Sequence, residues 1–285
     1  MQQPKGRLLI IGGHEEKIFT GERYTSVRSG INVPHFDILG TLINSIPHSH
    51  RRIEVIAAAS SIPDEMEAAY IAAYESAGYD HVGIMRVDDA GDVVSPEFIS
   101  RIHYAHAVFF TGGDQRLLTK ALRDTELLEA ILKKYRADPH FIVAGTSAGA
   151  MSLPQVIIER GVIEEALLKN DLVLGTGFGF IDNVIVDTHF IRRGRIGRLA
   201  HAVALNKPFT GIGLGEDGAL LISKGCEAEC LGSGMVVIID SSELGATNAG
   251  TADEATPIAI ENLKMHILAE GCRYDLQTRQ FSLKD

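Results

Sequence analysis

Short apolar runs alternate with segments of helical periodicity through the first half of the chain. Runs with the length of buried strands occupy residues 8–11, 53–59, 81–87 and 107–110, and another begins at Phe141. Between them, residues 65–77 and 117–135 have the apolar spacing of helices, the second as one helix or as two joined near Asp124. This alternation predicts a mostly parallel sheet with helices on both faces.

In open sheets of this kind, ligands bind beyond the carboxyl ends of the strands. Three segments of the first half follow such ends: the pair Gly12-Gly13, residues 112–115, and Ser147. We therefore expect these segments to share one rim of the sheet.

The second half continues with short strands and a long polar segment. Further strands are predicted at residues 184–186, 212–214, 219–222 and 236–239. Residues 241–257 have few large apolar side chains, which predicts an exposed loop, and residues 264–268 and 272–276 are predicted to pair as a terminal hairpin. With no repeat or linker in view, residues 6–285 are predicted to form a single α/β domain.

Composition narrows the classes of function. The chain has 285 residues, of which 45% are hydrophobic and 22% charged, as in ordinary globular proteins. Its formal net charge of −10 argues against a nucleic-acid partner, because phosphate binding needs a basic surface. No run is long enough for a membrane span or a signal peptide, and the three cysteines form no even framework. These features predict a cytoplasmic protein.

A serine motif is the strongest chemical signal. Residues 141–150 read FIVAGTSAGA, so that a strand-like run leads into the pattern Gly145-x-Ser147-x-Gly149. This pattern is typical of a nucleophile elbow, a sharp strand-to-helix turn that exposes a serine hydroxyl. One glycine is expected to allow the strained turn and the other to allow close packing. The alternative is that the small residues serve helix packing alone.

A nucleophilic serine needs a base and a group that orients the base. His189 is favoured among the eleven histidines because it follows an apolar run. Asp187 would share a strand face with His189, whereas Glu216 follows a different strand and would approach the imidazole end-on. The spacing favours Glu216 and leaves Asp187 open.

Other segments have two interpretations each. Gly112-Gly113 is an ordinary turn, or its N–H groups hold an oxyanion together with the N–H of Ala148. Residues 192–198 contain four arginines, which form a solvated helix start or bind substrate carboxylates. The histidine pairs at 48/50 and 103/106 lack further ligands, so neither a metal nor another cofactor is predicted.

These motifs together resemble the cyanophycinases, members of the serine peptidase family that also contains α-aspartyl dipeptidase. The resemblance runs in consistent order from about residue 6 to residue 278. The matching segments are residues 11–17, 111–115, 145–150, 187–190, 193–199, 213–217 and 271–276.

The resemblance implies a catalytic triad of Ser147, His189 and Glu216, with Gly113 and Ala148 as the oxyanion hole. The implied substrate-binding residues are Gln115, Asp187, Arg193, Arg195 and Arg198. It implies a sandwich similar to class I glutamine amidotransferases and flavodoxins, with a C-terminal β-hairpin, and a homodimer. The implied reaction is hydrolysis of cyanophycin to β-Asp-Arg dipeptides through an acyl-enzyme.

Two other functions stay open. A dipeptidase for Asp-X or isoaspartyl peptides is one, because Thr188 stands where the resemblance leads us to expect glutamine. A non-catalytic binding module of amidotransferase-like fold is the other.

Overall fold

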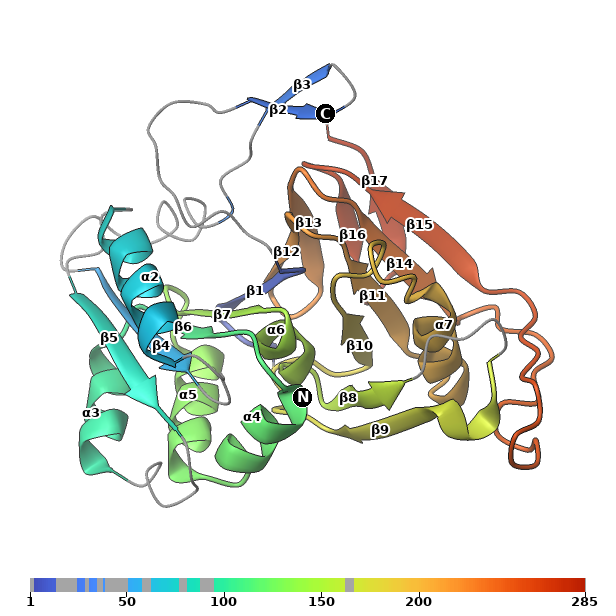
Figure 1. The fold of residues 1–285 in the computed structure, drawn as a ribbon, viewed down its shortest axis with the longest axis horizontal. Coiled ribbons are helices and arrows are strands. Elements are labelled where there is room, and N and C mark those ends of the chain that lie inside the picture. The colour runs from blue at the N-terminus through green and yellow to red at the C-terminus, as the bar shows by residue number, and fades with distance from the viewer. Residues whose placement is uncertain are drawn as a thin grey trace.

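The computed structural model describes most of the chain (Figure 1). The described residues are 3–13, 25–28, 31–34, 38, 51–57, 63–76, 81–87, 95–161 and 167–284. Nine strands form the central sheet, in the order β17-β16-β13-β12-β1-β7-β6-β4-β5.

One half of the central sheet is parallel and the other half is antiparallel. The parallel strands are β1 (Arg7–Ile11), β4 (Arg52–Ala57), β5 (His81–Arg86), β6 (Ala107–Phe110) and β7 (Ile142–Thr146). The antiparallel strands are β12 (Gly218–Ser223), β13 (Glu227–Gly232), β16 (Arg273–Asp275) and β17 (Gln280–Ser282). The predicted β-α alternation corresponds to the parallel half.

Helices cover both faces of the parallel half, as the continuous apolar strands predict. Alternate residues of β1 belong to different cores: Leu9 packs in the cluster of Tyr70 and Tyr74, whereas Leu8 packs in the cluster of Ile102 and Ile131. The helices that carry these residues are α2 (Pro63–Ser76), α3 (Pro96–Tyr104) and α5 (Glu126–Ala137). The central sheet flanked by helices is therefore confirmed.

The predicted helical segment 117–135 forms two helices. The first, α4 (Gln115–Leu122), ends before Asp124, whose backbone has a φ of 62°. Thr125 then caps α5, because its side-chain oxygen accepts a hydrogen bond from the Leu128 N–H at 3.3 Å. Of the two alternatives, the helix pair is correct.

A second sheet of four strands packs beside the antiparallel half. Its order is β10 (Val184–Asp187), β11 (Thr210–Leu214), β14 (Val236–Asp240) and β15 (Lys264–Leu268). Ile212 and Ile238 share a core with Leu220 of the central sheet, while Ile185 packs with Leu199 of α7 (Ile196–Leu205) on the other face. The smaller elements are β2 (Thr25–Arg28), β3 (Ile31–Pro34), β8 (Val156–Gly161), α6 (Ala148–Ser152), η2 (Lys169–Asp171) and β9 (Leu172–Thr176).

The prediction that residues 264–268 pair with residues 272–276 is wrong. β15 pairs with β14 in the second sheet, whereas β16 pairs with β13 and β17 in the central sheet. Gly271, with a φ of 82°, lies between them and donates its N–H to the Cys230 carbonyl at 2.7 Å. The C-terminal hairpin is therefore β16–β17, because the chain changes sheets at this turn.

The predicted loop at residues 241–257 contains no helix or strand, but it is not wholly exposed. Leu244, Ala249 and Ala252 are buried. Within the described residues, no helix is both long and apolar enough to cross a membrane. The assignment of residues 6–285 to one domain stays a prediction.

A buried acid in β4 provides a test of this architecture. Glu54 is fully buried and accepts hydrogen bonds from Arg52 at 2.7 Å and from Arg101 at 3.1 Å. Glu54→Gln removes the charge that balances these arginines, so we expect the free energy of unfolding to fall by about 3 kcal/mol in urea titrations. Glu229→Gln, at an exposed ion pair with Arg273, is the control and should change it by less than about 1 kcal/mol. Equal losses in the two variants would contradict the prediction.

Candidate active site

Ser147 occupies a strained turn between β7 and α6. Its φ is 51° and its ψ is −117°, which L-residues rarely adopt. The two glycines have the two roles that the sequence predicts. A Cβ added at Gly145 would lie 2.7 Å from the carbonyl carbon of Gly149, so the absence of a side chain there allows the turn to fold back. A Cβ added at Gly149 would lie 2.2 Å from the Phe110 oxygen, so this glycine allows α6 to pack closely on the sheet, while the positive φ itself is at Ser147.

Ser147, His189 and Glu216 form one hydrogen-bonded relay. The Ser147 Oγ lies 3.0 Å from Nε2 of His189, and Nδ1 of His189 lies 2.9 Å from Oε1 of Glu216. Each residue follows the carboxyl end of a parallel strand, respectively β7, β10 and β11. Of the two acids that the sequence left open, Glu216 is the one that contacts the imidazole.

The end of β1 holds the three segments of this relay together. Successive carbonyls of Ile11, Gly12 and Gly13 accept hydrogen bonds from the backbone N–H groups of Ser147, His189 and Asp217, at 3.1, 3.0 and 3.2 Å. Sequence reasoning placed Gly12-Gly13 on the same rim but did not identify this role. The signal was the glycine pair directly after a buried strand.

Gly13 also makes room for the imidazole of His189. Its φ is 98°, and a Cβ added there would lie 2.5 Å from Cε1 and 2.6 Å from Nε2 of His189. The imidazole therefore occupies the space of a side chain at residue 13.

Burial lowers the pKa of His189, and the nearby cations Arg193 and Arg195 act in the same direction. The hydrogen bond to Glu216 opposes them. The net lowering keeps the imidazole neutral at neutral pH. An ionised Glu216 can only accept, so the imidazole proton belongs on Nδ1 and Nε2 is free to take the Ser147 proton.

Asp187 pairs with two arginines and not with His189. It is fully buried; Oδ2 accepts from Arg198 Nε at 2.6 Å, and Oδ1 accepts from Arg195 Nη1 at 3.0 Å. Arg198 is 9% exposed and the Arg195 side chain 11%, whereas Arg193 is exposed. The interpretation of this segment as a solvated helix start therefore holds for only part of it.

The other predicted site residues lie on the same rim. A Cβ added at Gly112 would lie 3.5 Å from Ser147 Cβ, and Ala148 begins α6 directly after the serine. Gly113 has a φ of 145°. The side-chain Nε2 of Gln115 donates hydrogen bonds to the carbonyls of Ile158 and Glu159 at 2.9 and 3.0 Å. Its Oε1 therefore points away from these two carbonyls. Both donors of this amide are thus used within the protein.

The sequence predicts no metal site at its histidine pairs, and the structure describes only some of these histidines. The pair at 48 and 50 and residues 14–17 of the first motif lie outside the described residues. His106 accepts a hydrogen bond from the Arg52 N–H at 3.3 Å through Nδ1. Among the residues that the structure describes, no group of three or more His, Cys, Asp and Glu side chains is arranged to hold a metal ion.

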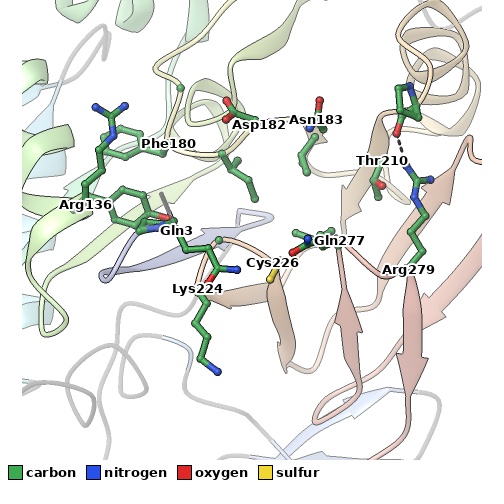
Figure 2. Close-up of a pocket in the computed structure, with 18 residues that line it drawn as sticks. Gln3, Arg136, Phe180, Asp182, Asn183, Thr210, Lys224, Cys226, Gln277 and Arg279 are labelled. Atoms are coloured by element: carbon green, nitrogen blue, oxygen red, sulfur yellow. Dashed lines mark hydrogen bonds between the residues drawn. The ribbon is translucent and has the colours of Figure 1, made fainter. Parts of the chain in front are cut away.

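A cavity of about 750 Å³ lies at the amino ends of the parallel strands, opposite the end that carries Ser147 (Figure 2). Its lining includes Arg136, Phe180, Lys224 and Arg279. These residues lie before β7, before β10, after β12 and in the turn between β16 and β17, respectively. Because the relay lies at the carboxyl ends of the parallel strands, this cavity is separate from it.

A serine, a histidine and a carboxylate in hydrogen-bonded series on an α/β sheet define the class of serine hydrolases. The family model of Peptidase family S51 matches residues 30–229. The chain belongs to this family of serine peptidases.

Full-length relatives support the assignment. The chain is 33% identical over 278 residues to a cyanophycinase of Trichormus variabilis, covering 98% of this chain and 88% of the relative. It is 30% identical over 279 residues to a cyanophycinase of Geminocystis herdmanii, covering 98% and 97%. The crystal structure of a peptidase from an acI-B1 actinobacterium matches the fold with a TM-score of 0.63 at 21% identity, covering 96% of this chain and 98% of that one.

Gly13 provides a test of the relay geometry. Gly13→Ala should slow labelling of Ser147 by a fluorophosphonate about 100-fold or more, because the new methyl group displaces the imidazole. The control is Gly179→Ala, where φ is also positive, at 75°, but no atom lies within 4 Å of the added Cβ. If both variants label at the wild-type rate, the imidazole does not depend on residue 13.

Proposed function

We propose that this peptidase hydrolyses cyanophycin and releases β-Asp-Arg dipeptides through an acyl-enzyme. The observation that carries the proposal is the Ser147–His189–Glu216 relay, with its two hydrogen bonds of 3.0 and 2.9 Å. The full-length relatives named cyanophycinase support the choice of substrate.

In the proposed mechanism, Nε2 of His189 takes the Ser147 proton while Oγ attacks a backbone carbonyl of the substrate. The N–H groups of Gly113 and Ala148 stabilise the oxyanion. The imidazolium then protonates the leaving amine, and Glu216 stabilises its charge. Water hydrolyses the acyl-enzyme, with His189 again as the base.

Asp187 acts through its partners in this proposal. Because it is fully buried and bonded to Arg195 and Arg198, it holds the two guanidinium groups in place and does not reach the substrate itself. The exposed Arg193 is available to substrate carboxylates. Gln115 uses its amide hydrogens internally, so its Oε1 would accept a hydrogen bond from a substrate N–H or guanidinium.

We also propose that the protein is a cytoplasmic homodimer built from one domain. The compartment is supported by three free cysteines, and the dimer by the resemblance to cyanophycinases.

Ser147→Ala is expected to reduce cyanophycin hydrolysis by about 10³- to 10⁶-fold, because it removes the nucleophile. Release of β-Asp-Arg by the purified protein is the measurement. Ser152→Ala is the matched control: this serine lies in α6 and donates to the Ala148 carbonyl at 2.8 Å, outside the relay. Near wild-type turnover by the Ser147 variant would end the proposal.

A dipeptidase is the second candidate, which Thr188 favours. Its Oγ1 is buried without a hydrogen-bond partner, beside His189 in sequence, where glutamine was expected. Comparison of kcat/KM on cyanophycin and on Asp-X and isoaspartyl dipeptides separates the two. The polymer is expected to be the better substrate, and faster turnover of the dipeptides would select the alternative.

The lowered pKa of His189 predicts the pH dependence. The base must be neutral to act, so kcat/KM should fall with decreasing pH through a pKa below the ordinary histidine value of 6.5. The protein should thus keep more activity in mild acid than an unperturbed histidine would allow. An acid limb above 6.5 would contradict this account of the site.

A further inference from the structure

Glu216 makes a second contact that the proposed mechanism does not use. Its Oε1 bonds to His189, and its Oε2 accepts a hydrogen bond from Nη1 of Arg192 at 2.9 Å. We propose that Arg192 is a positioning residue of the relay, which fixes the Glu216 carboxylate so that Oε1 stays aligned with the imidazole. This inference rests on the proposed function, because it concerns the same site.

The geometry supports a specific role for this arginine. A glutamate side chain has three rotatable bonds, and each hydrogen bond to its carboxylate removes part of its freedom to turn. A second bond on the other oxygen fixes the carboxylate plane. Arg192 is three residues after His189, so the turn that carries the base also carries the group that holds the acid.

Arg192 differs from the other arginines of its segment. Arg195 and Arg198 bond to Asp187, whereas Arg192 reaches Glu216. Its side chain is 68% exposed, but its partner is only 19% exposed and is already bonded to the base. An ordinary surface ion pair would contribute little and would leave the imidazole unaffected.

The charge of Arg192 has a consequence for protonation. Among the described residues, the charged groups that act on the imidazole are Glu216, which favours the imidazolium, and Arg193 and Arg195, which disfavour it. A cation on the far oxygen of Glu216 reduces the attraction of that carboxylate for the imidazolium. Loss of alignment acts in the opposite direction, because a weaker Oε1 contact lowers the pKa of His189. We expect the charge effect to dominate, because Oε1 keeps its contact with Nδ1 for most of the time, so removing the cation should raise this pKa.

The test compares Arg192→Met with Arg192→Lys in the full-length protein. NMR titration of the imidazoles follows His189 directly, with its signal assigned from a His189→Asn spectrum. We expect Arg192→Met to lower the proton dissociation constant of His189 about two- to fivefold. Arg192→Lys should restore it, because the contact uses a single nitrogen that an ammonium can replace.

Activity provides the second measurement. Arg192→Met should reduce kcat on cyanophycin about fivefold with little change in KM, and its acid limb should move to higher pH. Arg273→Met is the matched control, since Arg273 is 67% exposed and pairs with Glu229 outside the relay. It should match the wild type in the titration and in turnover.

A titration of His189 that is the same in Arg192→Met, Arg273→Met and the wild type would overturn the inference. So would a loss of activity in Arg192→Met that Arg192→Lys does not rescue. The failure of the proposed function has a different signature: no turnover of cyanophycin by the wild type, whatever the imidazole titrations show.

Discussion

Three successive backbone hydrogen bonds at the end of β1 determine the geometry of the site. The carbonyls of residues 11–13 accept from the N–H groups of Ser147, His189 and Asp217, so one strand end aligns the serine, the histidine and the residue next to Glu216. β1 can do this because it lies between the two halves of the central sheet, parallel to β7 and antiparallel to β12. The distances within the relay therefore follow from backbone pairing as much as from the side chains.

Such close convergence of backbones requires small residues. An added Cβ at Gly12 would lie 1.9 Å from the Gly215 oxygen, and one at Gly13 would overlap the imidazole. Two residues with side chains in the relay have strained backbones: the φ values of Ser147 and His189 are 51° and 47°. The tight network of backbone contacts holds these two residues in a conformation that they would otherwise leave.

The sequence predicted the parts of the site that depend on local pattern. A strand running into Gly145-x-Ser147-x-Gly149 indicated an exposed serine, and the positions of His189 and Glu216 after two different strands favoured a contact between them. The sequence could not predict which distant groups come into contact. The pairing of Asp187 with two arginines and the contact of the imidazole with Gly13 both depend on the tertiary fold. For the same reason, strand propensity at residues 264–268 and 272–276 was right, while their pairing depended on the turn at Gly271 and on which sheet edge each strand met.

The charge of the rim differs from that of the whole chain. Burial lowers the pKa of Arg195 to about 10, so this guanidinium stays protonated at neutral pH. One buried carboxylate, Asp187, faces Arg195 and Arg198, and the exposed Arg193 adds a further cation. In a protein with a net charge of −10, the described segment 187–198 thus contains four arginines and a single acid. Asp187 bonds to both Arg195 and Arg198, so these two guanidinium groups are held in place, whereas the exposed Arg193 is not bonded to Asp187.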